Sequence, residues 1–192
     1  MSVVLDADGY GLVAVTEVDP TVLDTFSCGK RHLDEFLTQR AAFFHKEWLG
    51  FVWIVLHRDM DYPIGYFSLN NEALELSDAE ETNLGMSDYS GLKRFPAIMM
   101  GRLAVDTRLQ GSGASTQLMH MALDMIGGRL ATSQLSAARL VIVDADNDPK
   151  VLRYYEKHGF ERSSWADKQA THQGGKKSRA TVKMLRDILQ PW

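Results

Sequence analysis

The sequence predicts a single domain of the α/β (α+β) class, in which helices pack on a β-sheet. Two observations lead to this prediction. The chain has 192 residues, of which 45% are hydrophobic and 24% charged, as in an ordinary globular domain. Segments of strand character and segments of helical periodicity follow one another in the order βα-ββ-β-α-β-α-β. We expect residues 1–192 to form one domain with an irregular insertion at about residues 70–95.

The first part of the chain predicts a strand, a helix and a β-hairpin. Residues 12–18 alternate between apolar and polar side chains, which is typical of a strand. Residues 30–49 carry apolar side chains at three- and four-residue steps, so they predict one amphipathic helix that ends at Gly50. Residues 51–57 and 64–69 are rich in aromatic and branched side chains, and the turn between them predicts a hairpin.

Residues 70–95 are the least regular part of the sequence. They are acidic at first and then rich in glycine and serine. We interpret them as a long loop, with a short strand near residues 72–76. Loops of this length are often functional, and a solvated insertion is an equal alternative.

The second part of the chain predicts a central strand and several elements after it. Residues 97–105 are almost continuously apolar, which indicates a strand covered on both faces. Residues 115–126 predict a helix that ends at Gly127 and Gly128. The remaining segments predict a strand at residues 140–143, a helix at 148–158, a polar loop at 162–179 and a strand at 181–185.

Composition excludes several classes of protein. The longest apolar runs are far below the roughly 18 residues that a membrane span requires, and the N-terminal residues do not resemble a secretory signal. A single cysteine excludes an intrachain disulfide and favours a cytoplasmic location. We interpret Cys28 as a small buried thiol, because no histidine is paired with it by spacing. The net charge of −4 excludes a globally basic nucleic-acid binder but leaves room for a local basic face.

The strongest candidate site lies where the central strand leads into a helix. Small residues and two glycines permit a tight turn there, and the helix that follows presents unpaired N–H groups. Such a turn suits a pyrophosphate, although glycines that serve only the turn are an equal alternative on spacing alone. The turn lacks the lysine of a P-loop and the third glycine of a Rossmann fingerprint. The residues concerned are Leu103, Ala104, Val105, Gln110, Gly111, Ser112, Gly113, Ala114 and Ser115.

Three segments resemble the GNAT superfamily of acetyltransferases. Residues 105–115 resemble its coenzyme A loop, Gln/Arg-x-x-Gly-x-Gly/Ala, through Gln110 and Gly113. Arg108, Gly111 and Gly113 also satisfy the pattern, but the Gln110 frame keeps the usual spacing from Val105. Residues 151–160 resemble the superfamily's Ala-x-x-Phe-Tyr-Glu-Lys-x-Gly-Phe ending. Residues 26–37 and 101–106 resemble the branch of GNAT toxins found in toxin–antitoxin modules.

The resemblance implies a fold and an activity. The fold would be a mixed, mostly antiparallel twisted sheet of about six or seven strands, flanked by about four helices and splayed at the central strand. The activity would be transfer of an acetyl group from acetyl-CoA to the α-amine of aminoacyl-tRNA, with no metal. The resemblance also implies a homodimer and a ribbon-helix-helix antitoxin as a partner.

The resemblance also assigns roles to residues. The main chain of Leu103, Ala104 and Val105 would hold the acetyl carbonyl and the pantetheine arm, with Asn147 near the arm, and the loop at residues 110–115 would hold the pyrophosphate. Tyr155 would be the general acid, because a phenol with a pKa of about 10 is protonated at neutral pH. Without the resemblance, Tyr155 would be interpreted as an ordinary residue of an amphipathic helix.

The acceptor is constrained by the absence of an identifiable base. An α-amine titrates near about 8 and is partly neutral in the cytoplasm, whereas a lysine near about 10.4 needs a base. Glu72 and Glu75 are candidate bases, but acidic residues in a polar loop are usually solvated. A small-molecule or protein amine remains an alternative acceptor, and a binding module without turnover is an alternative of another class. Candidate RNA-binding cations are Lys30, Arg31, Lys93, Arg94, Lys176, Lys177 and Arg179.

Overall fold

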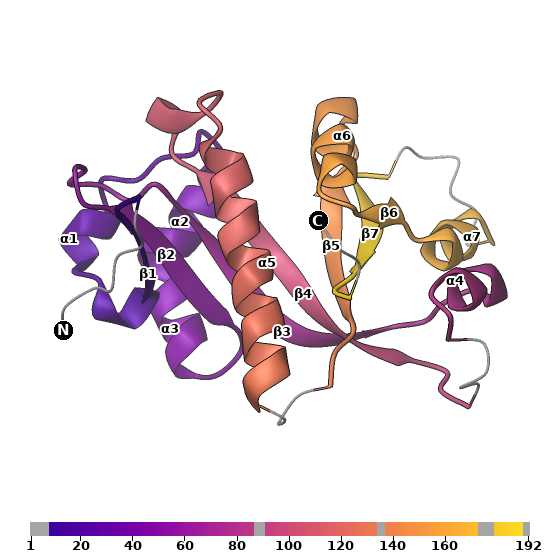
Figure 1. Ribbon diagram of the computed structural model, residues 1–192. Helices are drawn as coiled ribbons and strands as arrows, with labels where there is room; N and C mark the ends of the chain where they lie inside the picture. Colours follow the sequence, from indigo (N-terminus) through magenta and orange to yellow (C-terminus); the bar gives the residue numbers. More distant parts are fainter. Residues whose placement is uncertain (1–7, 87–90, 134–136, 173–178, 190–192) are drawn as a thin grey trace. The chain divides into compact units, whose positions relative to one another are not determined.

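The computed structural model describes residues 8–86, 91–133, 137–172 and 179–189 (Figure 1). Its strands form a seven-stranded sheet in the order β1-β2-β3-β4-β5-β7-β6. The chain divides into two compact units. Unit 1 comprises residues 1–70 and 100–125, and unit 2 comprises residues 71–99 and 126–192. This sheet confirms the predicted fold class.

Unit 1 is built on an antiparallel ladder. Strand β1 pairs with β2 from Tyr10 opposite His57 onward, and β2 pairs with β3 from Phe51 opposite Leu69 onward. Helices α2 and α3 lie on one face of these strands, and the first part of α5 lies on the other (Figure 1). The elements are β1 (Tyr10–Ala14), η1 (Val15–Glu17), α1 (Pro20–Leu23), α2 (Arg31–Gln39), α3 (Ala41–Lys46), β2 (Phe51–His57), β3 (Gly65–Leu74), β4 (Phe95–Val105), η3 (Thr107–Leu109) and α5 (Ala114–Ser133), of which β3, β4 and α5 continue into unit 2.

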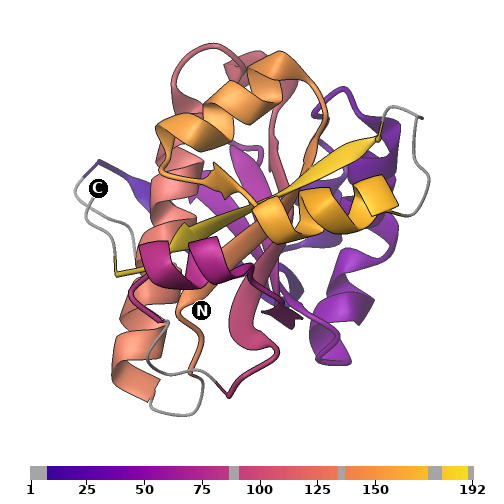
Figure 2. The same ribbon diagram turned by 90° about the vertical axis from the view of Figure 1, so that its right-hand side faces the viewer.

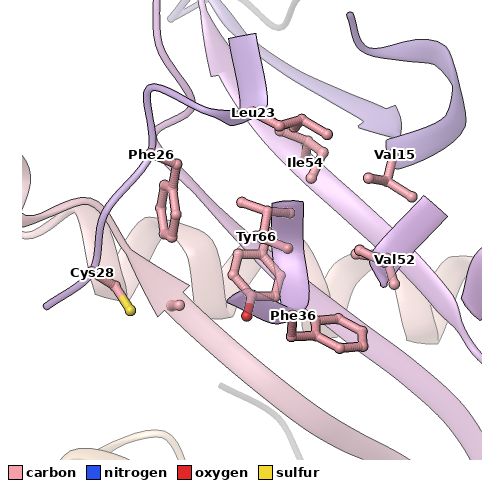
Figure 3. Packing of buried hydrophobic residues seen from close by; sticks show 11 residues of the cluster. Val15, Leu23, Phe26, Cys28, Phe36, Val52, Ile54 and Tyr66 are labelled. Atoms are coloured by element: carbon pink, nitrogen blue, oxygen red, sulfur yellow. The ribbon is translucent and has the colours of Figure 1, made fainter. Parts of the chain in front are cut away.

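Aromatic side chains form the centre of the unit 1 core (Figure 3). Tyr66 is fully buried and packs edge-on against Phe26, with 5.6 Å between the ring centroids. Phe36 from α2 stacks on the other side of Tyr66, at 6.3 Å. The Tyr66 hydroxyl donates a hydrogen bond of 2.9 Å to the Leu33 carbonyl, so its one polar atom is satisfied. This packing fixes α2 against the sheet.

Two predicted elements of unit 1 have different bounds in the structure. The predicted helix at residues 30–49 is two helices, because Arg40 leaves the helical conformation with φ −129° and ψ −23°. The break lets Ala41 become fully buried at the start of α3. The predicted strand at residues 12–18 ends at Ala14 and continues as the 3-10 turn η1, in which Val15 enters the core. Periodicity alone does not locate a break between two helices that bury the same apolar stripe.

Unit 2 contains the other end of the sheet (Figure 2). Strand β4 pairs in parallel with β5 over residues 97–99 and 140–142, and this short pairing is what a sheet splayed at its central strand requires. Strand β7 is antiparallel to β5 along its whole length and to β6 at residues 161–162. The further elements are α4 (Asp78–Asn83), β5 (Leu140–Asp146), α6 (Pro149–Lys157), β6 (Glu161–Arg162), α7 (Ser164–His172) and β7 (Thr181–Asp187).

Helix α5 does not end where the sequence predicts. It continues through Gly127 and Gly128 to Ser133, and neither glycine has a positive φ. A glycine inside a helix costs only about 0.5–1 kcal/mol relative to alanine. The buried side chains of Leu123 and Ile126 compensate for this cost, so two glycines weaken the helix without ending it.

Two segments that the sequence predicts as loops contain the helices α4 and α7. The carboxylate of Glu80 accepts hydrogen bonds at the start of both helices. Ser77 and Glu80 form a capping box at the start of α4, within the predicted irregular insertion. Glu80 also accepts hydrogen bonds from the main-chain N–H groups of Ser164 at 2.8 Å and Trp165 at 3.2 Å, at the start of α7. Several hydrogen bonds therefore hold the pKa of Glu80 below its usual range despite partial burial. Helix α7 occupies part of the predicted loop at residues 162–179, because its N-terminus finds this partner far away in sequence.

Within the described ranges, no helix is both long and apolar enough to cross a bilayer. The same residues hold no cluster of three or more His, Cys, Asp or Glu side chains that could bind a metal ion.

Candidate active site

The loop before α5 presents its main chain to open space. Gly111 has φ +83° and Gly113 has φ +96°, conformations that favour glycine, and a Cβ at either would meet nothing within 4 Å. The N–H groups of these two glycines have no hydrogen-bond partner among the described residues. Helix α5 begins directly afterwards at Ala114, and its first turn adds the partial positive charge of a helix N-terminus. These groups fit a phosphate or pyrophosphate of a nucleotide.

A cavity of about 360 Å³ lies beside this loop and belongs entirely to unit 1. Its volume is within the range of small-molecule sites. Polar groups come from the loop and the start of α5, and apolar walls come from the β2–β3 turn and β1. The lining residues are Tyr10, Met60, Ile64, Leu109, Ser112, Gly113, Ala114 and Gln117.

A buried carboxylate anchors the start of the loop. Asp106 is fully buried and accepts hydrogen bonds from the Arg108 side chain at 2.7 and 2.8 Å and from the Arg108 N–H at 2.9 Å. It also accepts the Ser27 N–H at 3.1 Å. These bonds lower the pKa of Asp106 although burial acts to raise it. The Arg108 guanidinium lies 3.5 Å from the ring centroid of Tyr62. Sequence reasoning missed this clamp, and its only signal was an aspartate directly after a buried strand.

Gln110 positions the loop through its side chain. Its Nε2 donates to the Cys28 carbonyl at 2.9 Å and to the Val105 carbonyl at 3.1 Å. Both amide hydrogens are therefore used within the protein, so Gln110 connects the loop to β4 and to residues 25–30. Asp34 connects the same segment to α2 by accepting the Cys28 N–H at 2.8 Å and the Ser27 hydroxyl at 3.0 Å.

The end of β4 provides the residues predicted to hold the acetyl and pantetheine groups. Ala104 and Val105 are buried and Leu103 is half-buried. Gly65 of β3 packs against this backbone so closely that a Cβ there would collide with the Ala104 carbonyl oxygen. The main chain of β4 at this point therefore packs closely against β3.

The predicted acid lies on α6 in unit 2. Asp148 caps α6 by accepting the N–H of Lys150 at 2.7 Å and of Val151 at 3.4 Å, and Pro149 is the first helical residue. Gly159 ends the helix with φ +75°, as the sequence predicts. The buried Arg186 of β7 donates to the His158 carbonyl, which satisfies the end of the helix.

Tyr155 is held by aromatic packing on both sides. Its ring lies edge-on to Tyr154 and to Phe160, with 5.4 Å between the centroids in each pair. Burial, together with the negative charge of Asp146, raises the pKa of Tyr155 to about 12. The phenol is therefore fully protonated at neutral pH and able to donate. Asn147 lies before this helix, and its side-chain N–H donates to the Arg179 carbonyl at 3.0 Å.

Cys28 is buried, which confirms its interpretation as a structural thiol. Burial and the neighbouring Asp34 raise the pKa of Cys28 to about 11. The thiolate is therefore rare at neutral pH, and a nucleophilic role is disfavoured.

Several of the candidate RNA-binding cations are already paired. Arg31 contacts Glu35 at 2.6 Å, Arg94 donates to the Ala73 carbonyl at 3.0 Å, and Arg179 contacts Asp167 at 2.8 Å. Lys93 is exposed. Lys176 and Lys177 lie outside the described residues.

Known proteins were compared with this chain by sequence and by structure. No family model matches it. A tRNA-acetylating toxin of Mycobacterium tuberculosis is 29% identical over 146 residues, which cover 76% of this chain and 81% of that protein. A structure of AtaT complexed with an acetyl-methionyl-tRNA has a TM-score of 0.68 at 21% identity and covers 90% of this chain and 93% of that one. A structure of a KacT mutant has a TM-score of 0.70 at 16% identity, with 94% and 95% covered.

The comparison by structure and the comparison by sequence agree with each other. The solved relatives share the arrangement of the sheet over nearly the whole chain. The curated relative shares sequence over about three quarters of it. The chain has the GNAT fold and, in sequence and in structure, resembles the toxin branch of that superfamily.

Proposed function

We propose that this protein is an acetyl-CoA-dependent N-acetyltransferase that acetylates the α-amine of aminoacyl-tRNA as the toxin of a toxin–antitoxin pair. The observation that carries the proposal is the likeness to a tRNA-acetylating toxin, and it is supported by a glycine turn open to its surroundings where the coenzyme A loop is predicted. A neighbouring solved structure contains acetyl-CoA and the C-terminus of an antitoxin.

The residues of unit 1 fit the coenzyme. The unpartnered N–H groups of Gly111 and Gly113 and the N-terminus of α5 would bind the pyrophosphate. Ser112 and Ser115 place hydroxyl groups in the same turn, where that of Ser112 donates to the Leu109 carbonyl at 2.7 Å and accepts the Ala114 N–H at 3.4 Å. The main chain of residues 103–105 would hold the carbonyl and the pantetheine arm, with Asn147 contributing a polar contact. Acetyl-CoA would supply the thioester that the amine attacks.

Tyr155 would act as the general acid. As the amine nitrogen bonds to the acetyl carbon, the carbon–sulfur bond breaks and the sulfur needs a proton. The Tyr155 hydroxyl would donate that proton and later recover one released by the amine. A pKa raised to about 12 keeps the hydroxyl protonated at neutral pH. No base is required for an acceptor whose amine titrates near about 8.

The remaining parts of the proposal concern partners and location. A cytoplasmic location follows from an acceptor that is made and used in the cytoplasm. A homodimer and a ribbon-helix-helix antitoxin are proposed from the resemblance to the toxin branch. Light scattering of the purified chain, alone and with a candidate antitoxin, measures both assemblies.

Mass spectrometry of aminoacyl-tRNA after incubation with acetyl-CoA tests the function. We expect a mass increase of one acetyl group on the aminoacyl adenosine, and none when the amine is blocked beforehand. If charged tRNA stays unmodified while coenzyme A is released with a small amine or a protein lysine, the alternative acceptor is correct. If no amine releases coenzyme A although acetyl-CoA binds, the chain is a binding module.

A further inference from the structure

Two arginines of unit 1 share one aromatic ring. The Arg102 guanidinium of β4 lies 3.6 Å from the ring centroid of Phe36 and 5.8 Å from that of Phe44. The Arg40 guanidinium, between α2 and α3, lies 5.8 Å from the same Phe36 ring. Phe36 is itself buried, so two positive charges lie close to one buried ring.

Neither guanidinium has a counter-charge in the part of the chain that the structure describes. Arg102 and Arg40 make no ion pair or side-chain hydrogen bond there. Other arginines of unit 1 do have such partners, since Arg31 pairs with Glu35 and Arg108 with Asp106. Arg102 is also half-buried, and burial and the charge of Arg40 both lower its pKa. Two like charges near one ring repel each other, and one of them is partly desolvated, so an anion bound between them would be stabilising.

The position of Arg102 relates this pair to the proposed reaction. Arg102 directly precedes Leu103, whose main chain is predicted to hold the acetyl carbonyl. A guanidinium stacked on a ring keeps the N–H donors of its edge available, and that fork matches the geometry of a phosphate. An aminoacylated RNA carries a phosphodiester within one nucleotide of its reactive amine.

We propose that Arg102 and Arg40 bind a backbone phosphate at the 3′ end of the acceptor RNA and thereby position the aminoacyl group. This inference rests on the proposed function and adds to it a phosphate subsite built from two stacked arginines. Arg102 is in this sense a positioning residue: it holds the acceptor and takes no part in proton transfer. Sequence patterns did not relate the two residues to each other, because Arg102 reaches the ring of Phe36 only through the tertiary structure.

Fluorescence anisotropy tests the subsite without any chemistry. The full chain is titrated with a labelled, uncharged RNA minihelix that ends in a single-stranded 3′ tail. We expect Arg102→Leu to weaken binding about tenfold, since a charge-assisted contact is lost. The slope of log affinity against log salt concentration should fall in magnitude by about one, because one phosphate contact is lost. Arg102→Lys should recover part of the affinity through its charge, and Arg40→Leu should weaken binding less. Arg162→Leu on β6 removes the same charge elsewhere and should bind as the parent does.

Acetylation kinetics then separate positioning from general damage. With aminoacyl-tRNA, Arg102→Leu should raise KM about tenfold or more. With an amino-acid amide, which carries no phosphate, the same variant should react as the parent does. Equal losses with both acceptors would indicate a structural role and overturn the inference.

Other outcomes are equally decisive. Unchanged RNA affinity in Arg102→Leu, or no RNA binding by the parent, would overturn the inference. If the variants instead lose affinity for an acidic peptide while RNA binding is unchanged, the pair serves a protein partner and the RNA inference is wrong. If Arg102→Leu melts early, Arg102→Lys and Arg40→Leu decide the question. If RNA binding depends on Arg102 but charged tRNA is never acetylated, the proposed function fails while the phosphate subsite stands.

Discussion

The loop before α5 and the helix that carries Tyr155 are stabilised in different ways. The loop of unit 1 exposes main-chain N–H groups and is fixed from below by a buried carboxylate, Asp106. Helix α6 of unit 2 carries the half-buried Tyr155, whose ring packs against neighbouring rings. The comparison teaches that the proposed anion site depends on backbone shape, whereas the proposed acid depends on the chemistry of one hydroxyl. Substitutions in the loop should therefore lower stability or the affinity for acetyl-CoA, whereas substitution of Tyr155 should lower kcat.

Replacing Tyr155 by phenylalanine should have the largest effect on activity. The ring packing is kept and only the donor is lost, so kcat should fall about 10²–10⁴-fold with little change in the affinity for acetyl-CoA. Tyr154→Phe is the matched control and should keep activity. Coenzyme A release and calorimetric binding measure the two quantities, and a variant that is equally active would remove Tyr155 from the mechanism.

The pH profile tests the same residue without substitution. Because the pKa of Tyr155 is raised to about 12, activity should rise as the acceptor amine deprotonates near about pH 8 and should not fall through deprotonation of the phenol before about pH 10. A decline with an apparent pKa well below 10 would indicate another acid.

Asp106→Asn should produce the largest loss of stability in the loop region. It removes the charge that faces the Arg108 guanidinium and places an amide donor there, so the free energy of unfolding should fall by about 2–4 kcal/mol at pH 7. Since folding lowers the pKa of Asp106, its contribution is present above about pH 4 and is lost as the pH falls through the lowered value. The difference between the two proteins in urea denaturation should therefore shrink under acid. A constant difference would contradict this account.

Gly113→Ala should affect binding more than folding. Alanine at φ +96° costs about 1 kcal/mol, and the added methyl group faces the open space proposed for the pyrophosphate. We expect the Kd for acetyl-CoA to rise about tenfold, measured by calorimetry. An unchanged Kd would place the coenzyme elsewhere.

Gly127→Ala should have the smallest effect and the opposite sign. The glycine is helical and a Cβ there meets nothing within 4 Å, so the substitution should stabilise the protein by up to about 1 kcal/mol without altering Kd or kcat. It is the control for Gly113→Ala, and a loss of stability in thermal unfolding would count against the described course of α5.

The sequence predicted the elements whose signals are local. The cap at Asp148, the ending at Gly159 and the apolar strand before the loop at residues 110–115 lie within a few residues of the features that define them. The break at Arg40 and helix α7 were missed, because a stripe shared by two helices and a cap from Glu80 depend on distant neighbours. The capping box formed by Ser77 and Glu80 has a local sequence signal, but that signal was overlooked because it lies within an acidic segment.

By itself, the amino-acid order determined the fold class and the small-residue turn before α5, and its resemblance to a known family pointed to Tyr155 as the candidate acid. The tertiary structure decided which groups support them. It brought Asp106 to Ser27, Gln110 to Cys28, and Arg102 to the ring of Phe36, which Arg40 already reaches from the end of the same helix. Periodicity and capping report the nearest few residues of the chain, whereas a buried charge or a stacked ring is satisfied by whatever folding brings within a few ångströms.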